Sequence, residues 1–160
     1  MISCGPSAKE EFYKNGNIQL RYYTDDGGRI DGRYTEFYQN GDTAVSCNFS
    51  EGQLDGTYRA YYEGRRVYYQ LEYISGKLVN IIQFKLKDGR SISQLDFQGG
   101  NGIINVYNPE TGDLDSKRTY VNGVPYGMKY LFFPGGRVDS SFVDSIAKGP
   151  GLIPNIPPFE

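Results

Sequence analysis

The sequence has no histidine and no tryptophan, and only two cysteines among its 160 residues. Without histidine, catalytic schemes of the Ser-His-Asp and Cys-His kinds are excluded, and so are zinc, haem and non-haem iron sites with histidine ligands. The two cysteines, Cys4 and Cys47, are a poor basis for a disulfide framework and too few for a metal site. The sequence therefore predicts a protein that is not an enzyme and that uses no cofactor and no metal.

A dominant charge and a long hydrophobic run are also lacking. Lys and Arg number 17 and Asp and Glu 19, which gives a net charge of −2 and no electrostatic footprint for nucleic acid. No stretch of the chain approaches the roughly 18 consecutive apolar residues of a membrane-spanning helix. We expect no nucleic-acid partner and no transmembrane segment.

What the sequence has in excess is glycine and tyrosine. It contains 21 Gly, 15 Tyr and 9 Phe. Aromatic residues favour strands and glycine favours tight turns, so this composition indicates short strands joined by turns. The length fits one domain with a core of its own.

The glycines repeat with a period of about 24 residues. One set of turn glycines consists of Gly16, Gly41, Gly64, Gly89, Gly112 and Gly136. A second set, about half a period away, consists of Gly28, Gly52, Gly76, Gly100 and Gly123. Two interleaved sets of turns are typical of a hairpin repeat. In the first set, Asn-Gly and Asp-Gly favour the type I′ turn, in which both central residues have positive φ.

Between the turns, residues alternate as they do in half-buried strands. Tyr58, Ala60 and Tyr62 fall on one face, whereas Arg59 and Tyr61 fall on the other. We predict an all-β protein, an open antiparallel meander of about six stacked β-hairpins in one elongated, twisted sheet. The predicted organisation is an N-terminal tail (1–10), the repeat domain (11–147) and a Pro-rich C-terminal arm (148–160).

The repeat resembles a known class. Phe12-Tyr13-Lys14-Asn15-Gly16, the G-x-I-x-G of residues 28–32, and the run from Tyr34 to Gly41 are similar to the MORN-repeat variant of YwqK-type antitoxins. The resemblance covers about residues 11–137 and is strongest in the first three copies. It implies a stack of β-hairpins, a protein-binding or scaffolding role and no catalysis. Ordinary MORN repeats carry a tryptophan that this sequence lacks, and the last three copies lose the tyrosine before the turn.

The tyrosines are the candidate binding residues, because tyrosine combines a large apolar area with a polar tip. The candidates are Tyr22, Tyr23, Tyr34, Tyr38, Tyr58, Tyr61, Tyr62, Tyr68 and Tyr69. The alternative is that they pack on the sheet, which the repeat requires in any case. Adjacent pairs such as Tyr68-Tyr69 should place one ring on each face, so that one ring of each pair is accessible.

The charged residues give weaker signals. Pairs such as Asp25-Asp26 and Asp113-Leu114-Asp115 are interpreted as turn residues that accept local backbone hydrogen bonds, rather than as a calcium or glycosidase site. Basic residues such as Arg65-Arg66 and Lys117-Arg118 are dispersed and matched by acids.

The two ends of the chain break the repeat. The C-terminal segment is rich in proline, which favours an extended conformation. Its apolar residues, Leu152, Ile153, Ile156 and Phe159, suggest an arm that docks on its own sheet or on a neighbouring subunit. At the other end, Ser3-Cys4-Gly5 is similar to a bacterial lipoprotein processing site without the apolar segment that should precede it. A lipid anchor at Cys4 is therefore the less favoured interpretation.

Our leading hypothesis is a non-enzymatic repeat protein that binds other protein subunits in a larger assembly, such as a bacteriophage virion. The alternatives are an antitoxin or immunity protein that neutralises a toxin, and a bacterial surface lipoprotein. The expected location is a virion or the bacterial cytoplasm, or the cell envelope if Cys4 is lipidated.

Overall fold

The structure, a computed structural model, describes residues 7–132 and 138–143. Within these residues it is all-β, and the predicted open antiparallel meander is confirmed. The turn glycine predicted at Gly136, the docking arm (Leu152, Ile153, Ile156 and Phe159) and Cys4 lie outside the described residues. The described part of the chain has no helix with the length and hydropathy needed to cross a bilayer.

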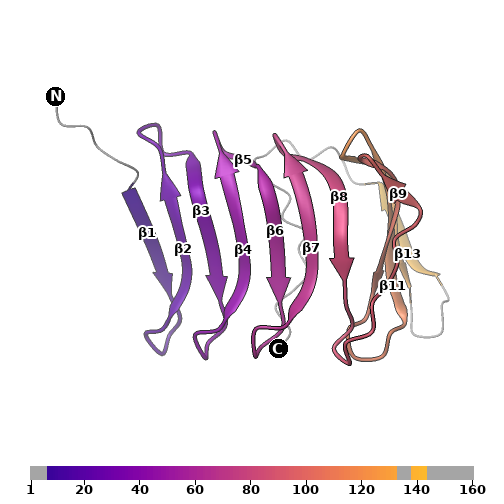
Figure 1. The fold of residues 1–160 in the computed structure, drawn as a ribbon, viewed down its shortest axis with the longest axis horizontal. Helices are drawn as coiled ribbons and strands as arrows, with labels where there is room; N and C mark the ends of the chain where they lie inside the picture. The colour runs from indigo at the N-terminus through magenta and orange to yellow at the C-terminus, as the bar shows by residue number, and fades with distance from the viewer. Residues whose placement is uncertain (1–6, 133–137, 144–160) are drawn as a thin grey trace.

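The strands form two sheets rather than the single sheet that we expected (Figure 1). In the first sheet, β1 (Ser7–Phe12), β2 (Ile18–Thr24), β3 (Ile30–Phe37), β4 (Thr43–Ser50), β6 (Gly56–Tyr61), β7 (Val67–Ile74) and β8 (Lys77–Phe84) follow in order, and the short β5 (Gln53–Leu54) pairs with β4. In the second, β9 (Phe97–Gln98), β10 (Asn101–Tyr107), β11 (Leu114–Val121), β12 (Val124–Phe132) and β13 (Val138–Val143) follow in order. The sheet begins at Ser7, so the predicted tail boundary at residue 10 falls inside β1.

The break between the sheets lies in the fourth copy of the repeat. Where a strand was expected, residues 85–96 make only the single bridge between Lys85 and Ser91. The Gln94 side chain, instead of a backbone carbonyl, accepts a hydrogen bond from β10: its Oε1 accepts the Asn105 backbone N–H at 3.0 Å. Residues 85–96 place Ile92 against the core cluster and bury Leu86, whereas the corresponding strand of the third copy, β7, buries Tyr69, Leu71 and Tyr73, so this segment has less apolar area to hold it in the sheet.

The two sets of turn glycines have the expected conformation. Every glycine of both sets within the described residues has a φ between +75° and +92°. The type I′ turn, however, occurs in the second set rather than the first. Both central residues have positive φ at Glu51-Gly52, Ser75-Gly76 and Asn122-Gly123, and each of these turns joins directly paired strands.

In the first set, the loops at Gly16, Gly41 and Gly89 share a different turn, whereas those at Gly64 and Gly112 have other hydrogen-bond patterns. At Gly16 the glycine N–H donates to the Tyr13 carbonyl (2.9 Å), and the Tyr13 N–H donates to the Asn17 carbonyl (2.8 Å). This is a three-residue loop, a type I turn followed by a left-handed glycine that forms a bulge. Asn15 is used there as an acceptor, because its Oδ1 receives the Asn17 N–H at 3.0 Å. The prediction of a type I′ turn at the Asn-Gly pairs of this set is therefore wrong.

Tyrosine hydroxyls join neighbouring copies along one end of the first sheet. Tyr13 donates to the Phe37 carbonyl (2.6 Å), and Tyr38 donates to the Tyr61 carbonyl (2.6 Å). Tyr62 then donates to the Lys85 carbonyl at 2.8 Å. Each tyrosine occupies the same place in its copy and reaches one period onward, so the sequence repeat is also a structural repeat. We call these three bonds the tyrosine ladder.

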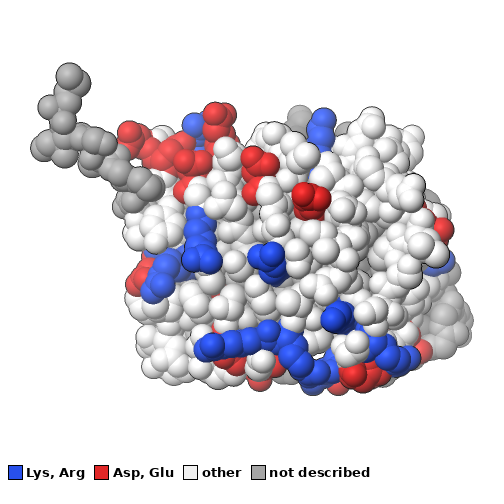
Figure 2. Space-filling view, in the orientation of Figure 1, with Lys and Arg blue, Asp and Glu red and all other residues white. Residues whose placement is uncertain are grey.

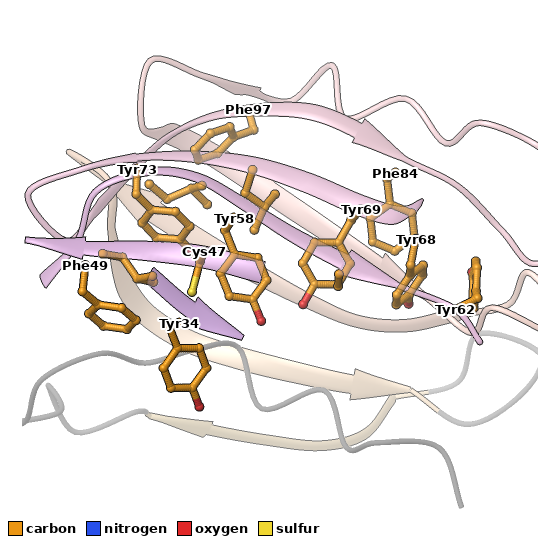
Figure 3. Packing of buried hydrophobic residues seen from close by; sticks show 14 residues of the cluster. Tyr34, Cys47, Phe49, Tyr58, Tyr62, Tyr68, Tyr69, Tyr73, Phe84 and Phe97 are labelled. Carbon is orange, nitrogen blue, oxygen red and sulfur yellow. The ribbon is translucent and has the colours of Figure 1, made fainter. Parts of the chain in front are cut away.

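The core lies between the two sheets. The inner face of the first sheet contributes a continuous aromatic cluster, part of which Figure 3 shows. Tyr58 is 1% exposed, and its ring stacks on Tyr69 with the centroids 5.8 Å apart. The second sheet packs against this cluster through Ile104, Val106, Tyr107 and Tyr120.

Candidate binding surface on the first sheet

Five of the nine candidate tyrosines belong to the core. Tyr34, Tyr58, Tyr62, Tyr68 and Tyr69 are each at most 8% exposed. They cannot form an exposed binding surface, so the packing alternative holds for them. Tyr68 and Tyr69 also contradict the expectation that adjacent rings lie on opposite faces, since their centroids are 5.0 Å apart in one cluster. The register between β6 and β7 shifts at this point: Ala60 pairs with Tyr69 and Tyr61 pairs with Val67, so Tyr68 is the extra residue of a β-bulge and the alternation of faces is interrupted.

Polar atoms are present inside this cluster. The Tyr34 hydroxyl donates to Glu36 Oε1 at 2.8 Å, and burial, followed by the charge of Glu36, raises the pKa of Tyr34 above its ordinary value. Burial likewise raises the pKa of Cys47 to about 12. Both groups are therefore held neutral at physiological pH, and the thiol is unsuited to nucleophilic chemistry.

The other four candidates are half-buried and lie in different places. Tyr22 packs against Tyr34 on the inner side, with ring centroids 6.3 Å apart. Tyr38 belongs to the tyrosine ladder. Only Tyr23 and Tyr61 lie on the outer face of the first sheet, where they line a shallow depression. The structure thus brings two of the nine together at one candidate surface.

Polar side chains cross this outer face in register. Cross-strand pairing aligns one residue from each strand of the sheet: Glu10, Arg21, Thr35, Ser46, Arg59, Gln70 and Gln83. We call this the outer polar row. Its members include an ion pair between Glu10 and Arg21 (2.7 Å) and a hydrogen bond from Gln83 Nε2 to Gln70 Oε1 (3.2 Å). Figure 2 shows basic side chains spread over this face and along one end of the strands, and acidic side chains near both ends, most of them at the opposite end.

The depression lies over β2, β3 and β4 and has a volume of about 430 Å³. Its lining consists of Arg21, Tyr23, Arg33, Thr35, Phe37, Thr43, Ser46, Tyr61 and Arg65. Thr35, Thr43 and Ser46 in this lining have small side chains, whereas the arginine and aromatic side chains of the lining are long. This difference in size is why the surface is hollowed here. The floor therefore presents hydroxyls and the rim presents guanidinium and aromatic groups.

The charges at the depression are only partly matched. Arg21 pairs with Glu10, and Arg65 pairs with Asp42 through Nε–Oδ1 at 3.1 Å. Within the described residues, two arginines have no carboxylate within ion-pair distance: Arg33, which lines the depression, and Arg59, which lies outside the lining in the outer polar row. Guanidinium groups and hydroxyls bind carboxylate and phosphate oxygens, so the surface can receive an anionic group.

This arginine cluster was not predicted. Basic residues such as Arg65-Arg66 and Lys117-Arg118 were predicted to be dispersed and matched by acids, whereas Arg21, Arg33 and Arg59, which are far apart along the chain, face outward on one sheet. Their shared feature is an outward position on strands that become neighbours, and a prediction of strand register would have been needed to detect it.

Of the two acidic groups singled out in the sequence, Asp25 has the predicted role, whereas the side chains of Asp26, Asp113 and Asp115 accept no local backbone hydrogen bond within the described residues. Asp25 Oδ1 accepts hydrogen bonds from the backbone N–H groups of Gly27 and Arg29, each at 2.9 Å. The Arg29 side chain and these amides lower the pKa of Asp25. Over residues 7–132 and 138–143, no group of three or more potential ligands converges on a metal site.

No protein-family model matches the sequence, and no curated protein matches it either. The resemblance to MORN repeats rests on the motifs quoted above and stays a prediction. The antitoxin and lipoprotein alternatives also stay predictions.

Proposed function

We propose that this chain is a non-enzymatic protein-binding repeat protein, a subunit of a larger assembly, and that it contacts its partner through the outer face of the first sheet. The observation that carries the proposal is the depression over β2, β3 and β4, where arginine, tyrosine and hydroxyl side chains meet on an exposed sheet. Tyrosine and arginine are the residues that interfaces favour most, because each combines a large contact area with directional hydrogen bonding.

The rest of the molecule also favours the outer face of the first sheet as the contact surface. Most of the inner face of the first sheet is occupied by the aromatic core, although a second depression lies at its β1 end, beside Leu20, Tyr22 and Ile30. The outer face carries a row of polar side chains across β1–β8 and offers a surface for contact. That face is held by regular pairing and by the tyrosine ladder, so its side chains are presented on a rigid frame. A rigid surface loses little conformational entropy when it binds.

The proposal can be tested by affinity purification of the full chain and two variants from the source cells. Arg33→Glu with Tyr61→Ala alters the depression, whereas Lys14→Glu makes the same charge change in an exposed turn at the end of the sheet. We expect proteins that co-purify with the wild type and with Lys14→Glu to be lost with the double variant. Retention of the same proteins by the double variant, or purification of the wild type alone, would contradict the proposal.

A further inference from the structure

The outer polar row has a spacing that indicates what kind of partner fits it. Arg21 and Arg59 are separated by three strand-to-strand steps, through Thr35 and Ser46. Neighbouring strands lie about 4.8 Å apart, so the two arginine positions are about 14 Å apart across the sheet. Between them lie two small hydroxyl side chains and, in the adjacent row, Arg33.

An extended polypeptide has nearly the same spacing. Side chains on one face of a strand recur every two residues, about 6.8 Å apart, so residues i and i+4 are about 13.6 Å apart. A segment lying across the strands of the first sheet would place side chain i at Arg21 and side chain i+4 at Arg59. Side chain i+2 would then lie over Thr35 and Ser46, within reach of Arg33.

The charges of the outer polar row and of Arg33 in the depression decide the chemistry of those side chains. Arg33 and Arg59 have no carboxylate partner among the described residues, and Arg21 uses Nε for Glu10, which leaves its terminal nitrogens for a ligand. Within the described residues, the hydroxyls of Thr35 and Ser46 likewise have no hydrogen-bond partner. We infer that the outer polar row binds an extended acidic segment of a partner protein, with carboxylates at positions i, i+2 and i+4.

A carboxylate-bearing segment fits better than a nucleic acid because the positive region is short. Glu10 ends the row on β1, and Glu72 lies beyond Arg59 on β7, one row away. A polynucleotide needs a longer track of positive charge along its backbone, and the chain as a whole carries a net charge of −2. Three carboxylates match the three arginines without extending past the acidic ends.

This inference rests on the proposed function and can be tested with two synthetic peptides of equal composition. In the alternating peptide, Glu-Ser-Glu-Ser-Glu, the acids share one face of a strand. In the block peptide, Ser-Glu-Glu-Glu-Ser, they do not. Binding of each fluorescently labelled peptide to the full chain is measured by anisotropy at low and at physiological ionic strength. We expect the alternating peptide to bind about fivefold more tightly, and salt to weaken it, because the contacts are exposed and charge-assisted.

Variants connect the binding to the row. Arg33→Gln and Arg59→Gln should each weaken the alternating peptide about five- to tenfold, and Thr35→Val, which removes one hydroxyl, about twofold. Lys14→Gln removes a positive charge away from the row and should leave the affinity unchanged. Circular dichroism and thermal unfolding are used to check that each variant is folded.

Several results would overturn the inference. These are no binding of the alternating peptide, equal binding of the two peptides, unchanged affinity in both arginine variants, and tighter binding of inorganic phosphate or of a single-stranded oligonucleotide. If the peptides fail but Arg33→Glu with Tyr61→Ala still loses the co-purifying proteins, only the acidic chemistry is wrong. If both experiments fail, the outer face is not the interface.

Discussion

The first and second sheets place their apolar residues differently. In the first sheet most large aromatic residues point inward and the outer face carries the outer polar row, but Tyr23 and Tyr61 lie on that outer face. Three large apolar side chains of this sheet, Phe12, Ile74 and Ile82, are also exposed. In the second sheet the exposed faces of β10, β11 and β12 carry large apolar side chains, namely Ile103, Val121, Val124, Tyr126 and Tyr130, each between 39% and 66% exposed. The first sheet thus follows the inside-outside pattern of the repeat closely, and the second follows it loosely.

The two sheets also differ in what joins their copies. The first sheet has the tyrosine ladder, which ends at Lys85, and the next copy has Leu86 where earlier copies have the donor tyrosine. The junction between the sheets combines side-chain packing, a hydrogen bond from the Tyr68 hydroxyl to the Tyr107 carbonyl (3.3 Å) and backbone contacts. Gly123 N–H donates to the Gly100 carbonyl (2.7 Å), and Leu78 N–H donates to the Gly123 carbonyl (3.0 Å). The fourth copy therefore lacks the donor tyrosine of the ladder, and the break between the sheets lies in the same copy. This break lets the second sheet fold against the first.

The largest expected effect comes from the core of the first sheet. Tyr58→Ala removes a ring that is 1% exposed, and we expect a loss of about 3–5 kcal/mol in the free energy of unfolding, measured by urea denaturation. Tyr126→Ala is the matched change in the second sheet, where the ring is 66% exposed, and it should cost less than about 0.5 kcal/mol. Similar losses in the two variants would show that the sheets do not differ in this way.

The next effect concerns the junction. Gly123→Ala should destabilise by about 2–4 kcal/mol, because φ is +76° and a Cβ would lie 2.7 Å from the Leu78 carbonyl oxygen. Gly41→Ala has a similar φ of +86° but open space around the Cβ, so it should cost only about 1–2 kcal/mol. The difference between the two losses in the free energy of unfolding measures how much the close approach of the two sheets at Gly123 adds to the strain of the turn. Equal costs in urea denaturation would mean that the junction contributes nothing beyond turn strain.

A smaller effect tests the tyrosine ladder. Tyr38→Phe removes one hydroxyl and leaves the Tyr61 carbonyl without its donor, so we expect a loss of about 0.5–1.5 kcal/mol. Tyr126→Phe removes a hydroxyl from an exposed ring of the second sheet and should have no measurable effect. A ladder that stabilises nothing would give the same midpoint of thermal unfolding for both variants and the wild type.

The smallest effect is a dependence on pH. Asp42 accepts hydrogen bonds from the Gly64 N–H and from the Arg65 side chain, and these bonds lower its pKa in the folded state. Its contribution is therefore present above the unfolded-state pKa, near 4, and is lost as the pH falls through the lower folded value. Asp42→Asn should flatten the decline of the unfolding temperature on acidification.

The matched control for this measurement is Asp113→Asn in the loop before β11. Within the described residues the Asp113 side chain makes no hydrogen bond and no ion pair, so the wild-type decline with acid should be retained. If Asp42→Asn and Asp113→Asn change the acid dependence equally, the bonds of Asp42 do not stabilise the first sheet.

Much of the fold could be predicted because the repeat is local. The glycines with positive φ fix the turns, and the alternation around Tyr58 fixes which side chains face inward. The turn type could not be predicted from Asn-Gly alone, because Asn15 stabilises a type I turn as a hydrogen-bond acceptor instead of adopting positive φ. The break at residues 85–96 depends on Gln94 meeting Asn105, a contact that no local pattern specifies.

The candidate site could be predicted less well than the fold. Tyr23 and Tyr61 were among the candidates, but the five buried tyrosines were included with them because a single-layer sheet has two accessible faces. Once the second sheet covers one face, the same alternation assigns those rings to the core. The cluster around Arg33 depends on long-range pairing of three strands, which residue spacing does not contain.

The tyrosine ladder has a consequence for how such a chain can change its length. Each donor and its acceptor are one copy apart, and the residue that follows the acceptor is the next donor position: Phe37 precedes Tyr38, and Tyr61 precedes Tyr62. Deleting residues 38–61 would join Phe37 directly to Tyr62, so Tyr13 would keep its acceptor and Tyr62 would keep Lys85. Duplication or deletion of one whole unit in the gene would therefore lengthen or shorten the first sheet without leaving a broken bond at the new junction.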